Sequence, residues 1–112
     1  MLTRVAIYEG AIEAGGEDAF FKDVAARLEP IWRSFPNVLD VRVQRVMHAD
    51  AGAIPIVMVL EMDFASQEAI DQSLSSDIKT RSHALTLDVL KPFSGRFFHF
   101  IAESRSIPAL AG

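Results

Sequence analysis

The sequence predicts one α+β domain of order βαββαβ, with four antiparallel strands in a single sheet and two helices on one face of it. Four short segments have strand patterns, two of them alternating and two apolar on both faces, and two longer segments between them repeat apolar residues at helical spacing. Right-handed crossovers fold this order into one sheet with both helices on the same side. The 112 residues suit one domain with one hydrophobic core.

The first strand and the first helix follow from the N-terminal third of the chain. Residues Leu2 to Glu9 alternate weakly and end at Gly10, which predicts a strand and then a turn. Glu17 and Asp18 favour a helix start after Gly15-Gly16, because acids stabilise the positive N-terminal end of a helix. Apolar residues then recur at steps that place them on one helical stripe: Phe21, Val24, Leu28, Ile31, Trp32 and Phe35.

Pro30 stands inside this predicted helix, two residues before the only tryptophan. On a helical wheel it lies nearly opposite the apolar stripe, so its missing N–H falls on the solvent side. A proline inside a helix costs about 3 kcal/mol, whereas each large apolar side chain that is buried contributes roughly 1.5 to 3 kcal/mol. We expect one kinked helix; the alternative is two helices separated at Glu29, because a residue before proline avoids helical geometry.

The middle of the chain predicts two further strands. "FPNV" predicts the turn that ends the helix, and Val38 to Met47 alternates Val41 and Val43 with polar residues. The charged side chains of this second strand indicate a sheet edge. After the loop "HADAGA", the stretch "IPIVMVLEMDF" is apolar on both faces from Ile54 to Leu60, which is typical of a strand covered on both sides.

The last third predicts a helix, a strand and a tail. Ser66 suits the N-cap of a helix with Ile70, Leu74 and Ile78, which continues to Leu90 with a break near "SSD" and ends at Lys91-Pro92. "GRFFHFIAE" predicts the fourth strand. We therefore expect a single domain over residues 1–103. The tail, residues 104–112, is expected either to fray or to lie over a partner.

Two helices can cover only one face of this sheet, yet the third and fourth strands are apolar on both faces. An uncovered apolar sheet of that size is rare on a monomer. The simplest cover is the same face of a second copy, so we expect a twofold homodimer.

This pattern resembles the dimeric α/β-barrel superfamily, in which two ferredoxin-like subunits pack their sheets together. Within it the chain looks most like the EthD-like and related stress-responsive barrel proteins. The resemblance covers "TRVAIYEG", "EPIWRSFPNVLDVRVQRV" and "VMVLEMDFASQEAIDQSLSS", with the final strand. EthD-like members often carry a histidine two positions ahead of the helix proline, where this chain has Leu28.

Composition excludes several classes of function. The chain has no cysteine, so disulfides, thiolate nucleophiles and thiolate metal sites are excluded. A net charge of −4 without a basic run argues against nucleic acid as a partner. No apolar stretch approaches a membrane span and no secretion signal opens the chain, so we expect a cytoplasmic protein that does not bind membranes.

Tyr8 and His99 are the candidate catalytic residues. If the strands align as expected, they share a sheet face with Val57, Val59 and Phe97, with Glu61 near one end. A phenol and an imidazole beside apolar walls suit proton transfer, because histidine titrates near neutral pH. The alternative, which is the commoner fate of buried polar groups, is a hydrogen-bonded set at the dimer interface in which Arg4 or Arg42 pairs with Glu61.

Trp32, Met58 and Phe64 are the candidate ligand-binding residues; the alternative is that the tryptophan is plain core. His48 and His83 are expected to face solvent, and the histidine spacings match no metal motif. The chain has no glycine-rich phosphate loop. We therefore expect no metal and no organic cofactor.

Two classes of function remain. The resemblance implies a small enzyme without a cofactor, an oxygenase, isomerase or cyclase that acts on a hydrophobic or aromatic compound. The alternative is a protein of the same fold that only binds a small molecule or serves as an accessory subunit. The sequence does not identify the compound.

Overall fold

A computed structural model describes residues 1–111, and it has the predicted element order. The strands are β1 (Leu2–Ile12), β2 (Asp40–Arg45), β3 (Ile56–Phe64) and β4 (Phe93–Glu103). The helices are α1 (Glu17–Asp23), the π-helical η1 (Val24–Leu28), α2 (Glu29–Trp32), α3 (Gln67–Leu74) and α4 (Asp77–Val89).

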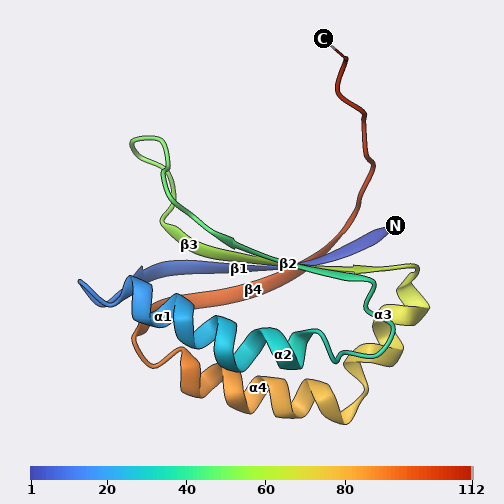
Figure 1. Cartoon of the computed structure of the whole chain (residues 1–112), viewed down its shortest axis with the longest axis horizontal. Coiled ribbons are helices and arrows are strands. Elements are labelled where there is room, and N and C mark those ends of the chain that lie inside the picture. The colour runs from blue at the N-terminus through green and yellow to red at the C-terminus, as the bar shows by residue number, and fades with distance from the viewer. Residues whose placement is uncertain (112) are drawn as a thin grey trace.

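The four strands form one antiparallel sheet in the order β2-β3-β1-β4. All helices lie on the same side of this sheet (Figure 1). This confirms the ferredoxin-like fold, and it confirms that the second strand is an edge. No helix in residues 1–111 is long and apolar enough to cross a membrane.

Strand register defines the two faces of the sheet, because residues directly opposite each other in neighbouring strands share a face. Tyr8 lies opposite Met58 on one side and Phe97 on the other, and Ala6 lies between Leu60 and His99. These residues belong to the covered face, against the helices. The residues between them, such as Ile7 and Val59, belong to the open face.

The hydrophobic core fills the space between the covered face and the helices. Its fully buried members include Val24, Leu28, Met58, Phe64 and Ile70. The predicted stripe of the first helix omitted Phe20, which is buried in the core, whereas the predicted Phe21 and Ile31 are half-buried and pack against the core. The Phe21 ring also packs under the guanidinium of Arg45, 4.8 Å away.

The chain accommodates Pro30 by changing the helix type rather than by breaking the helix. α1, η1 and α2 follow one another without a gap, as Figure 1 shows. The Glu29 N–H donates to the Val24 carbonyl, which is the wider π spacing. Pro30 itself is exposed, as predicted. The change to π-helical hydrogen bonding therefore lies beside the residue that has no backbone N–H to donate, and the apolar stripe of the helix stays buried against the sheet.

Gly10 lies inside β1, so the predicted turn at this position was wrong. Gly10 and Gly95 are paired across the β1–β4 ladder, and both have a φ of 150°. A Cβ at Gly10 would lie 2.1 Å from the Ser94 carbonyl oxygen. The glycines therefore permit a close backbone contact that lets β1 continue to Ile12.

The predicted helix and strand ends in the second half were largely correct. Ser66 caps α3, where its Oγ accepts a hydrogen bond from the Ala69 N–H at 3.1 Å. The helix breaks at Ser75 and Ser76 before α4 begins. β3 begins at Ile56 rather than Ile54, and β4 begins two residues earlier than predicted.

The tail and one long loop project from the sheet on its open side. Residues 104–111 form no helix or strand and run away from the end of β4 (Figure 1). The loop between β2 and β3 rises on the same side at the opposite end (Figure 1). The open face therefore lies between two projecting segments.

Candidate functional site

A cavity of about 70 Å³ lies between the covered face of the sheet and helices α2 and α4. We call it the covered-face cavity. Its apolar lining consists of Trp32, Phe35, Leu60, Met62 and Phe97. Its polar lining consists of Arg4, Tyr8, Lys79, Ser82, His83, Thr86 and His99. Lys79, His83 and His99 are exposed whereas most of the other lining residues are buried, so the cavity opens along the β4 edge beside α4.

Tyr8, Phe97 and His99 form a row of rings along the cavity. The Tyr8 and Phe97 rings stack at a centroid distance of 5.3 Å, and the His99 ring meets Phe97 edge-on at 5.8 Å. Tyr8 and His99 thus line the same cavity but are not bonded to each other; Phe97 lies between them. The two groups can therefore contact different atoms of one ligand from the same face of the sheet.

Both titratable rings are held in their neutral forms at pH 7. His99 is exposed as a residue, but partial desolvation of its ring at the cavity, together with the positive charges of Arg4 and Lys79, lowers its pKa to about 4. Burial raises the pKa of Tyr8 to about 12, an effect that Arg4 partly opposes. At pH 7 the neutral His99 ring is therefore a hydrogen-bond acceptor and a weak base, and Tyr8 can donate a hydrogen bond.

Arg4 brings a positive charge to the covered face. Burial lowers the pKa of its guanidinium. No side-chain hydrogen bond or ion pair involves Arg4 within the described chain, residues 1–111. The expected alternative, a pair between Arg4 and Glu61, is excluded because the two residues lie on opposite faces of the sheet.

Helix α4 contributes polar residues that sequence reasoning missed. Lys79, Ser82, His83 and Thr86 follow the i, i+3, i+4, i+7 spacing of one helical stripe, and all four line the cavity. His83 was expected to face solvent only; it is exposed but stands at the mouth. The stripe was visible in the sequence, but a polar stripe is usually taken as the solvent side of a helix.

The remaining candidate residues lie elsewhere. Met58 and Phe64 are fully buried in the core and do not line the cavity. Val57, Val59 and Glu61 belong to the open face, so their predicted alignment with Tyr8 and His99 was wrong. Of the five candidate site residues, the structure brings together Tyr8, His99 and Trp32.

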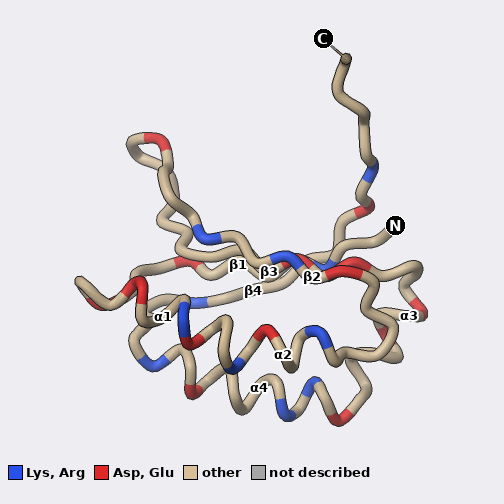
Figure 2. Tube along the Cα trace, viewed as in Figure 1, with Lys and Arg blue, Asp and Glu red and all other residues tan. Residues whose placement is uncertain are grey.

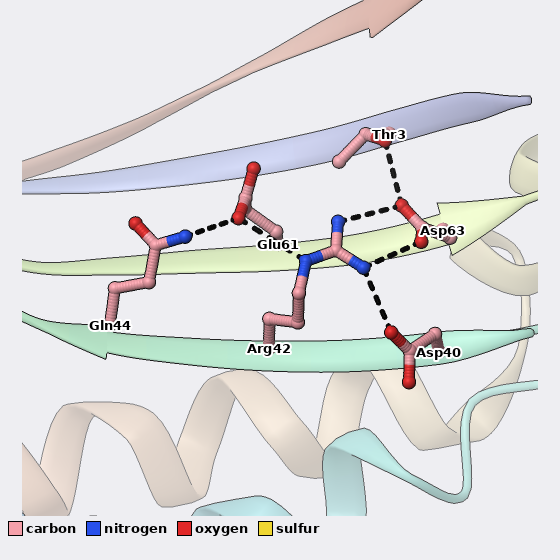
Figure 3. A network of polar contacts seen from close by, with 6 residues as sticks. All are labelled: Thr3, Asp40, Arg42, Gln44, Glu61 and Asp63. Atoms are coloured by element: carbon pink, nitrogen blue, oxygen red, sulfur yellow. Dashed lines mark hydrogen bonds and ion pairs between the residues drawn. The ribbon is translucent and has the colours of Figure 1, made fainter. Parts of the chain in front are cut away.

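The open face carries a polar network around Arg42 (Figure 3). The Arg42 guanidinium donates to both carboxylate oxygens of Asp63, at 2.6 and 3.0 Å, and to Asp40 at 2.8 Å. Thr3 donates to Asp63 at 2.7 Å, and Gln44 donates to Glu61 at 2.5 Å. These bonds hold the pKa of Asp63 below its usual value, chiefly through Arg42. Arg42 and Glu61 lie 3.4 Å apart within one chain; the expected pair between them across the dimer interface remains a prediction.

The other half of the open face is apolar. It consists of Val5, Ile7, Val57, Val59, Phe98 and Phe100. Phe98 and Phe100 remain 38% and 47% exposed, although large aromatic side chains usually lie inside a protein. We call this group the open apolar patch.

In residues 1–111, no three metal-ligating side chains gather into one cluster.

Comparison with known proteins supports the fold at low sequence identity. No family model matches the chain, and no curated protein sequence matches it. Among solved structures, it is similar to an ethyl tert-butyl ether D (EthD) family protein from Bacillus halodurans C-125. That match has a TM-score of 0.71 and 22% identity, and it covers 94% of this chain and 99% of the other.

Two further similar structures extend the comparison. One is a monooxygenase from the gene ActVA-Orf6 of Streptomyces coelicolor in complex with nanaomycin D, at TM-score 0.65 and 13% identity, covering 98% of this chain and 92% of the other. The other is a dimeric protein of unknown function with a ferredoxin-like fold from Bacteroides fragilis NCTC 9343, at TM-score 0.65 and 8% identity, covering 92% and 95%. The chain therefore has the fold shared by these proteins.

Proposed function

We propose that the protein is an EthD-like homodimer that binds a small aromatic compound in the covered-face cavity and catalyses proton transfer on it without a metal or organic cofactor. The reaction class is that of a cofactor-independent oxygenase, isomerase or cyclase. The observation that carries this proposal is the convergence of Tyr8, His99 and Trp32 on one cavity that opens to solvent. The structural similarity to a monooxygenase crystallised with nanaomycin D supports it.

The chemistry follows from the protonation states of the two rings. Neutral His99 takes a proton from an acidic O–H or C–H of the ligand, and the electron pair of that bond stays on the ligand; because the pKa of His99 is about 4, the ring is a weak base and holds this proton only transiently. Tyr8 donates a hydrogen bond to the oxygen on which negative charge develops. Returning the proton from His99 to another ligand atom completes an isomerisation. The apolar walls limit access of water during these steps.

The homodimer is supported by the open apolar patch. Partly exposed phenylalanines beside valines and isoleucine form a surface that a second copy can cover by twofold symmetry. The similar structure from Bacteroides fragilis is described as dimeric. The cavity lies on the other side of the sheet, so a dimer through the patch leaves its mouth free.

Native mass spectrometry with 1-naphthol and nanaomycin D tests this proposal. We expect a dimer that binds at least one of the two compounds, with quenching of the fluorescence of Trp32, the only tryptophan. Ser82→Leu, which fills the cavity, should weaken binding, whereas Ser75→Leu on the exposed helix end should not. A monomer that binds neither compound would contradict the proposal.

The alternative function, binding without chemistry, makes a different prediction for His99→Ala. If the protein is an enzyme, this variant still binds the compound but loses its conversion, as followed by liquid chromatography and mass spectrometry. If the wild-type protein binds the compounds and converts neither of them, the binding function is favoured.

A further inference from the structure

The charges of the covered-face cavity are all of one sign. Among its twelve lining residues are the cations Arg4 and Lys79, and none is aspartate or glutamate. The protein as a whole has the opposite balance, a net charge of −4. The cavity is therefore a local region of positive potential in an acidic protein.

Arg4 differs from every other arginine in the described chain. Ion pairs engage Arg27, Arg42, Arg45 and Arg96. The remaining arginines, at positions 33, 81 and 105, are exposed to water. Only Arg4 is both withdrawn from solvent and without a carboxylate partner in residues 1–111. A half-buried charge without a partner is costly for the folded protein, so a function is the expected reason for it.

The hydroxyl groups around Arg4 are also free to bind a ligand. Tyr8, Ser82 and Thr86 line the cavity and are buried as residues, yet none of the three side chains forms a hydrogen bond within the described part of the chain. Hydroxyl donors beside a guanidinium complement oxygen atoms that carry negative charge.

We infer that the ligand of the covered-face cavity is an aromatic carboxylate, with Arg4 as the group that binds its carboxylate. This deepens the proposed function and rests on it. A guanidinium presents two parallel N–H donors that match the two oxygens of a carboxylate. The rings of Trp32 and Phe97 provide apolar surface for the aromatic part of the ligand.

The cavity as it stands can enclose at most about one ring of the ligand. Its 70 Å³ is small beside the few hundred Å³ of a typical ligand pocket. Binding therefore requires Lys79 and His83, both exposed at the mouth, to move outward. Parts of a larger ligand would extend through the mouth beside β4.

Benzoate and benzamide test this inference, because the two compounds have nearly the same shape and differ in charge. Binding is followed through the single indole N–H signal of Trp32 in NMR titrations. We expect benzoate to bind about tenfold more tightly than benzamide, as a charge-assisted contact does relative to a neutral one. We expect acetate, which lacks the ring, to bind more weakly than benzoate.

Substitutions of Arg4 test whether this residue causes the preference for benzoate over benzamide. Arg4→Gln should remove the preference for benzoate and leave benzamide binding within about twofold, because only the charge contact is lost. Arg4→Lys should restore part of the preference, because it keeps the charge but not the paired donors. Arg33→Gln, which removes an exposed arginine, is the matched control and should change nothing.

The outcomes separate this inference from the proposed function. Benzoate that binds no better than benzamide, or a preference that survives Arg4→Gln, would overturn the inference and leave aromatic binding intact. Acetate that binds as tightly as benzoate would overturn it in favour of a site for small anions. Failure of benzoate, benzamide and 1-naphthol to bind would contradict the proposed function itself.

Discussion

The two faces of the sheet differ in whether the arginine on each face is paired with carboxylates. On the open face, Arg42 is surrounded by three carboxylates and bonds to each of them. On the covered face, Arg4 has no carboxylate partner in residues 1–111 and lies beside unbonded hydroxyl groups. The apolar residues differ as well, because most of those on the covered face are buried in the core whereas Phe98 and Phe100 of the open apolar patch are 38% and 47% exposed.

This difference indicates which kind of partner suits each face. A surface whose charges are already paired and whose apolar side chains are exposed is suited to a protein interface, where unpaired charges would be costly. A small cavity with unpaired donors is suited to a ligand that supplies the missing acceptors. The comparison thus supports the proposal that a second copy covers the open face and that a small molecule binds at the covered face.

Disruption of the open apolar patch should have the largest effect. Phe100→Glu places a charge at the centre of the expected dimer interface, and we expect it to weaken the dimer by about 2–4 kcal/mol. Light scattering after size-exclusion chromatography should then report the 12.3 kDa monomer. Leu87→Glu, at an equally exposed apolar residue on α4, is the control and should remain dimeric. A Phe100→Glu variant with the wild-type mass would exclude the patch as the interface.

Removal of Arg42 should destabilise the folded protein. Arg42→Met leaves the buried Asp63, whose side chain is 13% exposed, with only Thr3 as a partner. Because Arg42 itself is 38% exposed, we expect a loss of about 2–3 kcal/mol, below that of a fully buried pair. Urea unfolding at fixed protein concentration measures this loss in the free energy of unfolding. Arg81→Met should cost under about 0.5 kcal/mol, and an equal loss in both variants would argue against the network.

His99 should titrate far below ordinary histidines. Its pKa of about 4 is lower than the 6.5 of an unperturbed histidine, so the unfolded chain takes up a proton before the folded chain does. This group therefore contributes stability above pH 6.5 that is lost as the pH falls toward 4. NMR titration of the imidazole measures the midpoint. Arg4→Gln should raise that midpoint, whereas Arg96→Gln on the open face should not change it.

The titration of Tyr8 should have the smallest effect on stability of these four predictions. Its absorbance signal is readily isolated because the chain has one tyrosine. Its pKa of about 12 lies above the ordinary value of 10.0, so its stabilising contribution is present below pH 10 and is lost as the pH rises toward 12. Ultraviolet absorbance of the phenolate should show a midpoint near 12 in the folded protein. A midpoint near 10 before unfolding would mean that Tyr8 is not shielded in the cavity.

The sequence predicted the element order well but assigned several residues to the wrong face. Apolar periodicity predicts which residues of one strand share a side, and this was sufficient for the order and for the edge position of β2. It does not determine register between strands, and a shift of one residue exchanges the faces. Tyr8 is opposite Met58 rather than Val57 or Val59, so its predicted neighbours on the third strand lie on the other side.

The candidate site was predictable only in part for a related physical reason. Tyr8, His99 and Trp32 stand out because their types are rare in this chain and suit chemistry or binding. The contribution of Arg4 depends on the face to which β1 turns it, and the contributions of Ser82 and Thr86 depend on how α4 is rotated against the sheet; packing decides both rather than local sequence. The same packing left Met58 and Phe64 in the core and away from the cavity.

A crystal structure of the protein grown with benzoate would test the contrast between the faces most directly. We expect benzoate in the covered-face cavity, its carboxylate on the Arg4 guanidinium, and the open apolar patch against a twofold-related copy. A structure in which Arg4 turns to solvent, the cavity closes with side chains and the patch remains uncovered would contradict the account.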